Sequence, residues 1–141
     1  MNDIHIDASP QDVFALLADG KRYADWVVGA KRIRSVDPNW PAPGSKFHHT
    51  IGIGPIEIKD NTQVRSVDAP NSLTLEARMR PIGRACIKFE VEPDEGGSRV
   101  RMTEELINVP LVVRRLFDPP ICARNAEALR RLRDLVAPPS D

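Results

Sequence analysis

Four polar residues stand at alternating positions in strand-like stretches whose other members are apolar. They are His49, Asp60, Thr62 and Glu104. Alternation places such residues on the same face of a strand as their apolar neighbours, so we expect them to point into the interior. Buried polar groups need partners, and buried carboxylates need them most. One hypothesis is therefore that His49, Asp60 and Glu104 form a cluster that orients a ligand or acts as an acid and a base.

The alternative is a purely structural role for the same residues. Asp60 and Glu104 would then lie at strand ends, in water or paired with arginines such as Arg114 or Arg124. A single bulge would also turn a whole stretch of side chains outward. The sequence leaves both interpretations open.

Six further residues complete the predicted set of ligand contacts. Aromatic, aliphatic and amide side chains are expected along the strands and helices that enclose the interior, namely Trp26, Phe47, Ile58, Phe89, Met102 and Asn125. Trp26, together with Tyr23, either closes the mouth of a cavity or packs in the core. Asn125 interrupts the apolar face of the last helix, where it either points at a ligand or satisfies a backbone group.

No metal or cofactor is expected, and no catalytic residue is assigned. His48 and His49 are adjacent on a strand, so they point to opposite faces and do not share an ion. Cys86 and Cys122 are not at ligand spacing, and we expect reduced thiols. The glycines at 52 and 54 lack the third glycine and the helix of a dinucleotide-binding loop.

The elements that position these residues follow from periodicity. A strand over 4–8 precedes a helix that Ser9 caps and Gly20 ends, and a second short helix covers 21–27. Strands are predicted over 30–36, 46–54, 56–67, 72–80, 84–92 and 99–107. The last two form a hairpin around 93–98. A lead-in over 111–118 is interrupted by Pro119 and Pro120, and a long amphipathic helix follows over 121–136.

This order predicts an α+β fold in one domain, residues 1–141. Six to seven antiparallel strands form a curved sheet around the long C-terminal helix, with two short helices after the first strand. A sheet with one apolar face needs cover, and only the last helix is long enough to supply it. Such an arrangement commonly leaves a ligand cavity between sheet and helix.

Three stretches carry a resemblance to a known superfamily. They are the opening strand and helix over 4–17, the Tyr23–Trp26 segment with 43–47 (PGSKF), and the strand 99–105 after Gly96 and Gly97. On these motifs the chain resembles the START/Bet v 1-like (SRPBCC) superfamily of helix-grip proteins, in particular its polyketide cyclase/dehydratase-like members. The resemblance implies a cavity for an apolar or aromatic small molecule, lipid- or polyketide-like. It also implies an enzymatic alternative, a cyclase or dehydratase using a histidine–carboxylate pair in that cavity.

The composition of the chain excludes some classes of binding partner. The 141 residues are 41% hydrophobic and 28% charged, and 20 basic residues balance 20 acidic ones. A chain without positive excess lacks the electrostatic footprint of non-specific nucleic-acid binding. No stretch is long and apolar enough for a membrane span, and the chain reads as cytoplasmic. A small hydrophobic molecule is the expected partner, and a homodimer or other interaction module is the third hypothesis.

Overall fold

The computed structural model describes residues 2–27, 30–53, 55–79 and 83–137. Within these ranges it leaves out the side chains of 30, 31, 51–53, 56–58, 79, 113, 114 and 116–120.

Seven antiparallel strands form one sheet in the order β1-β7-β6-β5-β4-β3-β2. Their bounds are β1 Asn2–Ile6, β2 Ala30–Val36, β3 Lys46–Ile53, β4 Ile56–Asp68, β5 Ser72–Met79, β6 Gly83–Asp94 and β7 Gly97–Ile107. Consecutive strands from β2 to β7 are neighbours, and the first strand joins the last, so β1 and β2 form the two edges. The predicted curved antiparallel sheet is confirmed.

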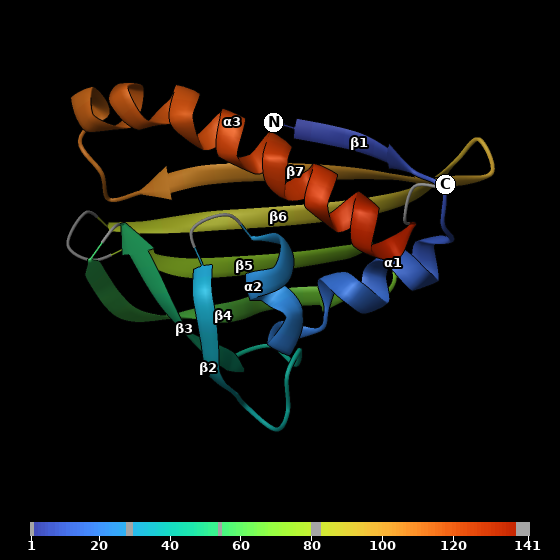
Figure 1. Cartoon of the computed structure of the whole chain (residues 1–141), viewed down its shortest axis with the longest axis horizontal. Helices are drawn as coiled ribbons and strands as arrows, with labels where there is room; N and C mark the ends of the chain where they lie inside the picture. Colours follow the sequence, from blue (N-terminus) through green and yellow to red (C-terminus); the bar gives the residue numbers. More distant parts are fainter. Residues whose placement is uncertain (1, 28–29, 54, 80–82, 138–141) are drawn as a thin grey trace.

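The helices lie on one side of this sheet (Figure 1). They are α1 Pro10–Leu17, the 3-10 turn Gly20–Arg22, α2 Tyr23–Trp26 and α3 Leu111–Val136. The α1 helix begins where Ser9 accepts a hydrogen bond from the Asp12 backbone N–H at 3.2 Å, with Pro10 at the first helical position. The two short helices after β1 and the long C-terminal helix agree with the helix-grip architecture expected from the sequence.

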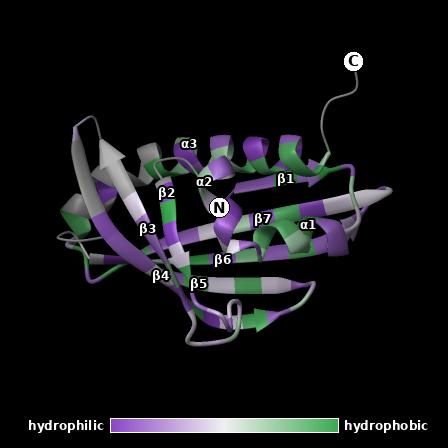
Figure 2. Ribbon diagram, turned by 60° about the horizontal axis from the view of Figure 1, so that its bottom comes forward, coloured by the Kyte–Doolittle hydropathy of each residue, from purple (hydrophilic) through white to green (hydrophobic). Residues whose placement is uncertain are grey.

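One core lies between the sheet and the helices. The α3 helix packs against β1, β7, α1 and α2, and it contributes the buried side chains of Ala128, Leu129 and Leu132. Apolar and polar stretches alternate along α3, whereas β4 is mostly hydrophilic (Figure 2). The polar side chains on the inner face of β4 are therefore shielded from solvent by the rest of the core.

Several element boundaries differ from those expected. The first strand covers 2–6 rather than 4–8, and the β6–β7 hairpin turns on Glu95 and Gly96 alone. Both turn residues have positive φ, +42° at Glu95 and +81° at Gly96, which is the geometry of a tight hairpin turn. A non-glycine residue at positive φ is uncommon, so composition suggested a longer loop.

The C-terminal helix is also longer than predicted. It runs from Leu111 to Val136 without a break at Pro119 and Pro120. Two prolines remove two backbone N–H donors, which is why the sequence indicated an interruption. Leu135, expected on the apolar face, is instead exposed.

Candidate functional site

Three of the predicted polar residues meet on the inner face of β3 and β4. The strands pair so that His49 lies opposite Asp60 and Phe47 lies opposite Thr62. Directly opposed residues of antiparallel strands point to the same face. All four side chains are buried, with His49 only 5% exposed, as the alternating pattern led us to expect.

The His49 imidazole has one satisfied and one unsatisfied nitrogen. Its Nε2 is 3.0 Å from the Thr62 hydroxyl, while Nδ1 is buried and has no hydrogen-bond partner among the described residues. Burial lowers the pKa of His49 below its usual 6.5, although the negative charge of Asp60 and the Asn61 backbone oppose this shift. The ring is therefore neutral at neutral pH and can act as an acceptor or a donor, depending on its tautomer.

Backbone contacts hold the polar pair in place. The Asp60 carboxylate accepts the backbone N–H of Asn61 at 2.9 Å. Arg34 of β2 donates to the carbonyls of His49 at 3.3 Å and Asp60 at 3.1 Å. No pattern in the sequence indicated this role of Arg34, because its contacts with two further strands depend on the order of the strands in the sheet.

Glu104 does not join this pair. Its side chain is 2% exposed, and both carboxylate oxygens accept from Arg124 Nη2, at 2.9 and 2.8 Å. Asn125 Nδ2 donates to the same carboxylate at 3.2 Å. Of the two roles that the sequence left open for Glu104, the structure shows pairing with Arg124. Asn125 hydrogen-bonds the same carboxylate, so Glu104 and Asn125 link β7 to α3.

Aromatic rings cover the inner face next to His49. Tyr23 stacks on Phe47 with ring centroids 4.6 Å apart, and Phe47 lies 5.3 Å from the His49 ring. Trp26 contacts Tyr23 at 5.1 Å and Phe89 at 5.7 Å. The rings of Trp26, Tyr23, Phe47 and His49 thus form a continuous row, which we call the aromatic row.

The two tryptophans differ in their hydrogen bonding. Trp26 is fully buried, and its Nε1 has no partner among the described residues. Trp40 donates from Nε1 to the Ala18 carbonyl at 2.7 Å. The Tyr23 hydroxyl also donates to a backbone carbonyl, that of Leu17, at 2.7 Å. Of the two tryptophans, Trp26 is therefore the one whose indole N–H is unused within the described ranges.

The remaining predicted contacts are placed as follows. Phe89 of β6 and Met102 of β7 are buried and directly opposite one another. Ile58 belongs to β4, and its side chain lies outside the described part of the structure. Thr50 of β3, which is not among the predicted contacts, is fully buried, with a hydroxyl that has no partner among the described residues.

Across the described ranges, no three His, Cys, Asp or Glu side chains come together in a way that would hold a metal ion. None of the described helices is long and apolar enough to cross a membrane.

The sequence matches a family model along almost its whole length. The model is described as "Polyketide cyclase / dehydrase and lipid transport", and it matches residues 2–137. The chain belongs to this family. None of the curated proteins matches the sequence.

Solved structures share the polyketide cyclase family fold seen here. Ara h 8.0201 superposes with a TM-score of 0.70 at 15% identity, covering 96% of this chain and 94% of its own. MLL2253 from Mesorhizobium loti gives 0.75 at 15%, covering 99% and 97%. The di-domain ARO/CYC StfQ from the steffimycin biosynthetic pathway gives 0.73 at 9%, covering 96% of this chain and 49% of its own. At these identities the likeness establishes the Bet v 1-like helix-grip fold alone.

Proposed function

We propose that the protein binds a small apolar or aromatic molecule, lipid- or polyketide-like, between its sheet and α3. The observation that carries this proposal is the aromatic row, which presents buried rings from α2 and β3 to a single interior. Burial of apolar surface would drive binding at about 25 cal/mol per Å². Membership of a family described by polyketide cyclisation and lipid transport supports the same class of ligand.

Small side chains also form a low point on the inner face, where β5 and β6 approach their connection. Ala77 of β5 lies opposite Ala85 of β6, and Thr62 and Leu106 flank this pair on the adjacent strands. Small side chains keep the sheet surface low beside the taller aromatic row. A planar molecule placed on these alanines would lie alongside the rings.

Native mass spectrometry of the mildly purified protein, compared with its denatured mass, tests the proposal. We expect a one-to-one adduct that disappears on denaturation, or one that forms when naphthalene is added. Ala85→Phe fills the low point and should weaken naphthalene binding. Val112→Ser is the control, because Val112 is exposed at the start of α3. An equal loss in both variants, or no adduct in any sample, would contradict binding in the interior.

A cyclase- or dehydratase-type reaction is the second candidate function. The specific observation in its favour is the neutral, buried His49, whose Nδ1 has no partner in the described part of the chain, which suits a general base at neutral pH. Asp60 lies directly opposite His49, so it is the carboxylate that would accompany His49. If His49→Gln and Asp60→Asn leave turnover of a verified substrate unchanged, this mechanism is wrong.

Homodimerisation remains a separate prediction. Among the described residues, the exposed large apolar side chains are Leu111 and Val112 at one end of α3 and Leu135 at the other. Leu135 lies 23 positions after Val112 along the helix, about 35 Å away, so these residues do not form one patch. Light scattering that gives the mass of a monomer would exclude a stable dimer.

A further inference from the structure

Among the described residues, the aromatic row has an unused hydrogen-bonding atom at each end. At one end is the Trp26 indole N–H, and at the other is Nδ1 of His49. Both side chains are more than nine-tenths buried, and water does not reach either atom from the surface. Unpartnered buried polar atoms are rare in folded proteins and costly, so each of these two atoms indicates a missing partner.

The two atoms require different hydrogen-bond partners. An indole N–H only donates, so its partner must be an acceptor such as a carbonyl oxygen. A neutral imidazole nitrogen donates in one tautomer and accepts in the other. A hydroxyl group satisfies it in either case, because a hydroxyl both donates and accepts.

A charged partner is disfavoured in this interior. The Arg124 guanidinium is already committed to both oxygens of Glu104, and Asp60 lies directly opposite His49. A ligand carboxylate near His49 would therefore be buried beside the Asp60 carboxylate, which is unfavourable. The rings of Tyr23, Phe47 and Phe89 favour an aromatic body through stacked and edge-to-face contacts.

We propose that the ligand is a neutral aromatic molecule with oxygen substituents, in which a carbonyl oxygen accepts from Trp26 Nε1–H and a hydroxyl pairs with His49 Nδ1. This inference rests on the proposed function, because it names the class of molecule bound in the same interior. It adds that recognition is polar at two identified atoms and that purely hydrocarbon ligands are the weaker ones. Buried water that satisfies both atoms is the competing explanation.

Three probes of similar size separate these possibilities in equilibrium dialysis. Naphthalene has no oxygen, 2-acetonaphthone offers a carbonyl, and 2-naphthol offers a hydroxyl. Each new hydrogen bond should tighten binding by about 3–10-fold relative to naphthalene. The ratio to naphthalene is taken within each variant, so a general loss of packing cancels.

Each anchor has a matched control of its own residue type. Trp26→Phe should remove the advantage of 2-acetonaphthone, and His49→Phe should remove that of 2-naphthol. Trp40→Phe should keep both ratios, because the Trp40 indole already bonds to Ala18. His48→Phe should keep them too, because His48 lies on the other face of β3 and its Nε2 is 3.6 Å from an Asp37 carboxylate oxygen.

The unmodified chain supplies a measurement that does not depend on variant folding. In a ¹⁵N-labelled protein, 2-acetonaphthone should move the Trp26 indole N–H resonance downfield, while the Trp40 resonance serves as an internal reference. Equal binding of all three probes, or oxygen preferences that survive in Trp26→Phe and His49→Phe, overturns the inference and leaves the proposed function standing. If none of the probes binds, the proposed function itself fails.

Discussion

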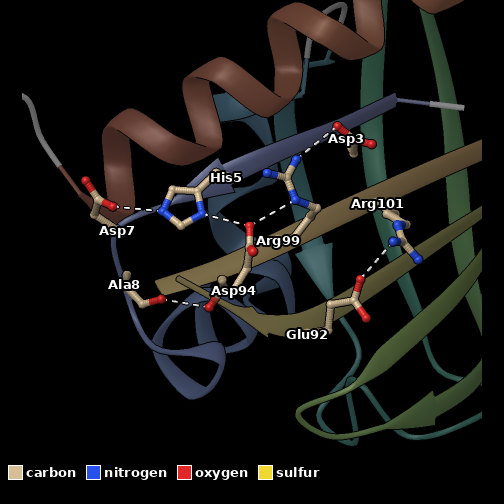
Figure 3. A network of polar contacts seen from close by, with 9 residues as sticks. Asp3, His5, Asp7, Ala8, Glu92, Asp94, Arg99 and Arg101 are labelled. Atoms are coloured by element: carbon tan, nitrogen blue, oxygen red, sulfur yellow. Dashed lines mark hydrogen bonds and ion pairs between the residues drawn. The ribbon is translucent and has the colours of Figure 1, made fainter. Parts of the chain in front are cut away.

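At the scale of single residues, the two histidines with altered pKa values respond to pH in opposite directions. His5 lies between two carboxylates, with Nδ1 3.0 Å from Asp94 and Nε2 2.9 Å from Asp7. Asp94 also accepts from Arg99, which in turn reaches Asp3 (Figure 3). The hydrogen bonds to Asp94 and Asp7 raise the pKa of His5 above its usual 6.5. His5, at the junction of β1 with the β6–β7 hairpin, is thus protonated more readily than a free histidine.

His5→Gln should therefore destabilise the protein more in acid than in base. A raised pKa in the folded state contributes stability that is fully present below 6.5 and is lost as the pH rises through the folded-state value. Urea unfolding of wild type and variant at about pH 5.5 and about pH 9 measures this difference. A destabilisation that is the same at both pH values would show that the His5 contacts are not formed in solution.

His49 should produce the opposite trend. Burial lowers its pKa below 6.5, so its contribution is intact above 6.5 and is lost as the pH falls through the folded-state value, where the unfolded chain binds the additional proton. In His49→Gln this part of the acid destabilisation should be absent. The stability difference between wild type and variant should then shrink towards acidic pH, and a difference that grows instead would contradict the buried neutral ring.

At the scale of elements, a buried carboxylate joins α3 to β7. Arg124 is 36% exposed, whereas Glu104 is 2% exposed, so removing the arginine leaves a buried charge with only Asn125 bonded to it. We expect Arg124→Gln to lower the free energy of unfolding by about 1–2 kcal/mol, discounted for the exposed side of the pair. Arg130→Gln is the control, because its pair with Glu127 lies on the exposed helix face, where an ion pair contributes little to stability. If urea unfolding showed the same loss of stability in both variants, the Glu104–Arg124 pair would not be a stabilising link between β7 and α3.

The junction of β1 and β7 depends on a close backbone approach at Gly97. A Cβ at this position would collide with the Ile6 carbonyl oxygen, so Gly97→Ala should cost about 1–3 kcal/mol by overpacking. Gly96 has positive φ but open space around it. Asparagine tolerates that conformation, and Gly96→Asn should therefore cost less than about 1 kcal/mol. Thermal unfolding of both variants should show the larger loss of stability in Gly97→Ala. A larger loss in Gly96→Asn would mean that the turn contributes more to stability than the strand contact.

Alternation predicted the strands and the inner face because burial of one face forces a period of two. It did not predict the exact hairpin, because Glu95 adopts a positive φ that few non-glycine residues take. It also did not choose a partner for Glu104, since several arginines were available and only the packing of α3 on the sheet selects Arg124. The aromatic row could not be predicted from the sequence for a similar reason, because α2 and β3 meet only in the folded chain.

At the scale of the whole molecule, the core joins elements from both ends of the sequence. Ile6 of β1, Trp26 of α2, Leu75 of β5 and Leu132 of α3 all belong to one buried cluster. Because α3 packs on β1, α1 and α2, the C-terminal helix covers side chains that come from the N-terminal part of the chain. Neither end of the chain can therefore complete this core without the other.

This shared core predicts that residues 1–141 unfold as one cooperative unit. In Trp40→Phe the remaining tryptophan is Trp26, which reports the centre of the core, while far-UV circular dichroism reports the whole sheet and α3. We expect the two signals to follow a single urea transition with the same midpoint and slope, as for a two-state domain. Separate midpoints would mean that the α2 and β3 region opens before the rest, and the single-domain prediction would then be wrong. Adding 2-acetonaphthone should shift both curves together, since a ligand that binds only the folded state stabilises the whole cooperative unit.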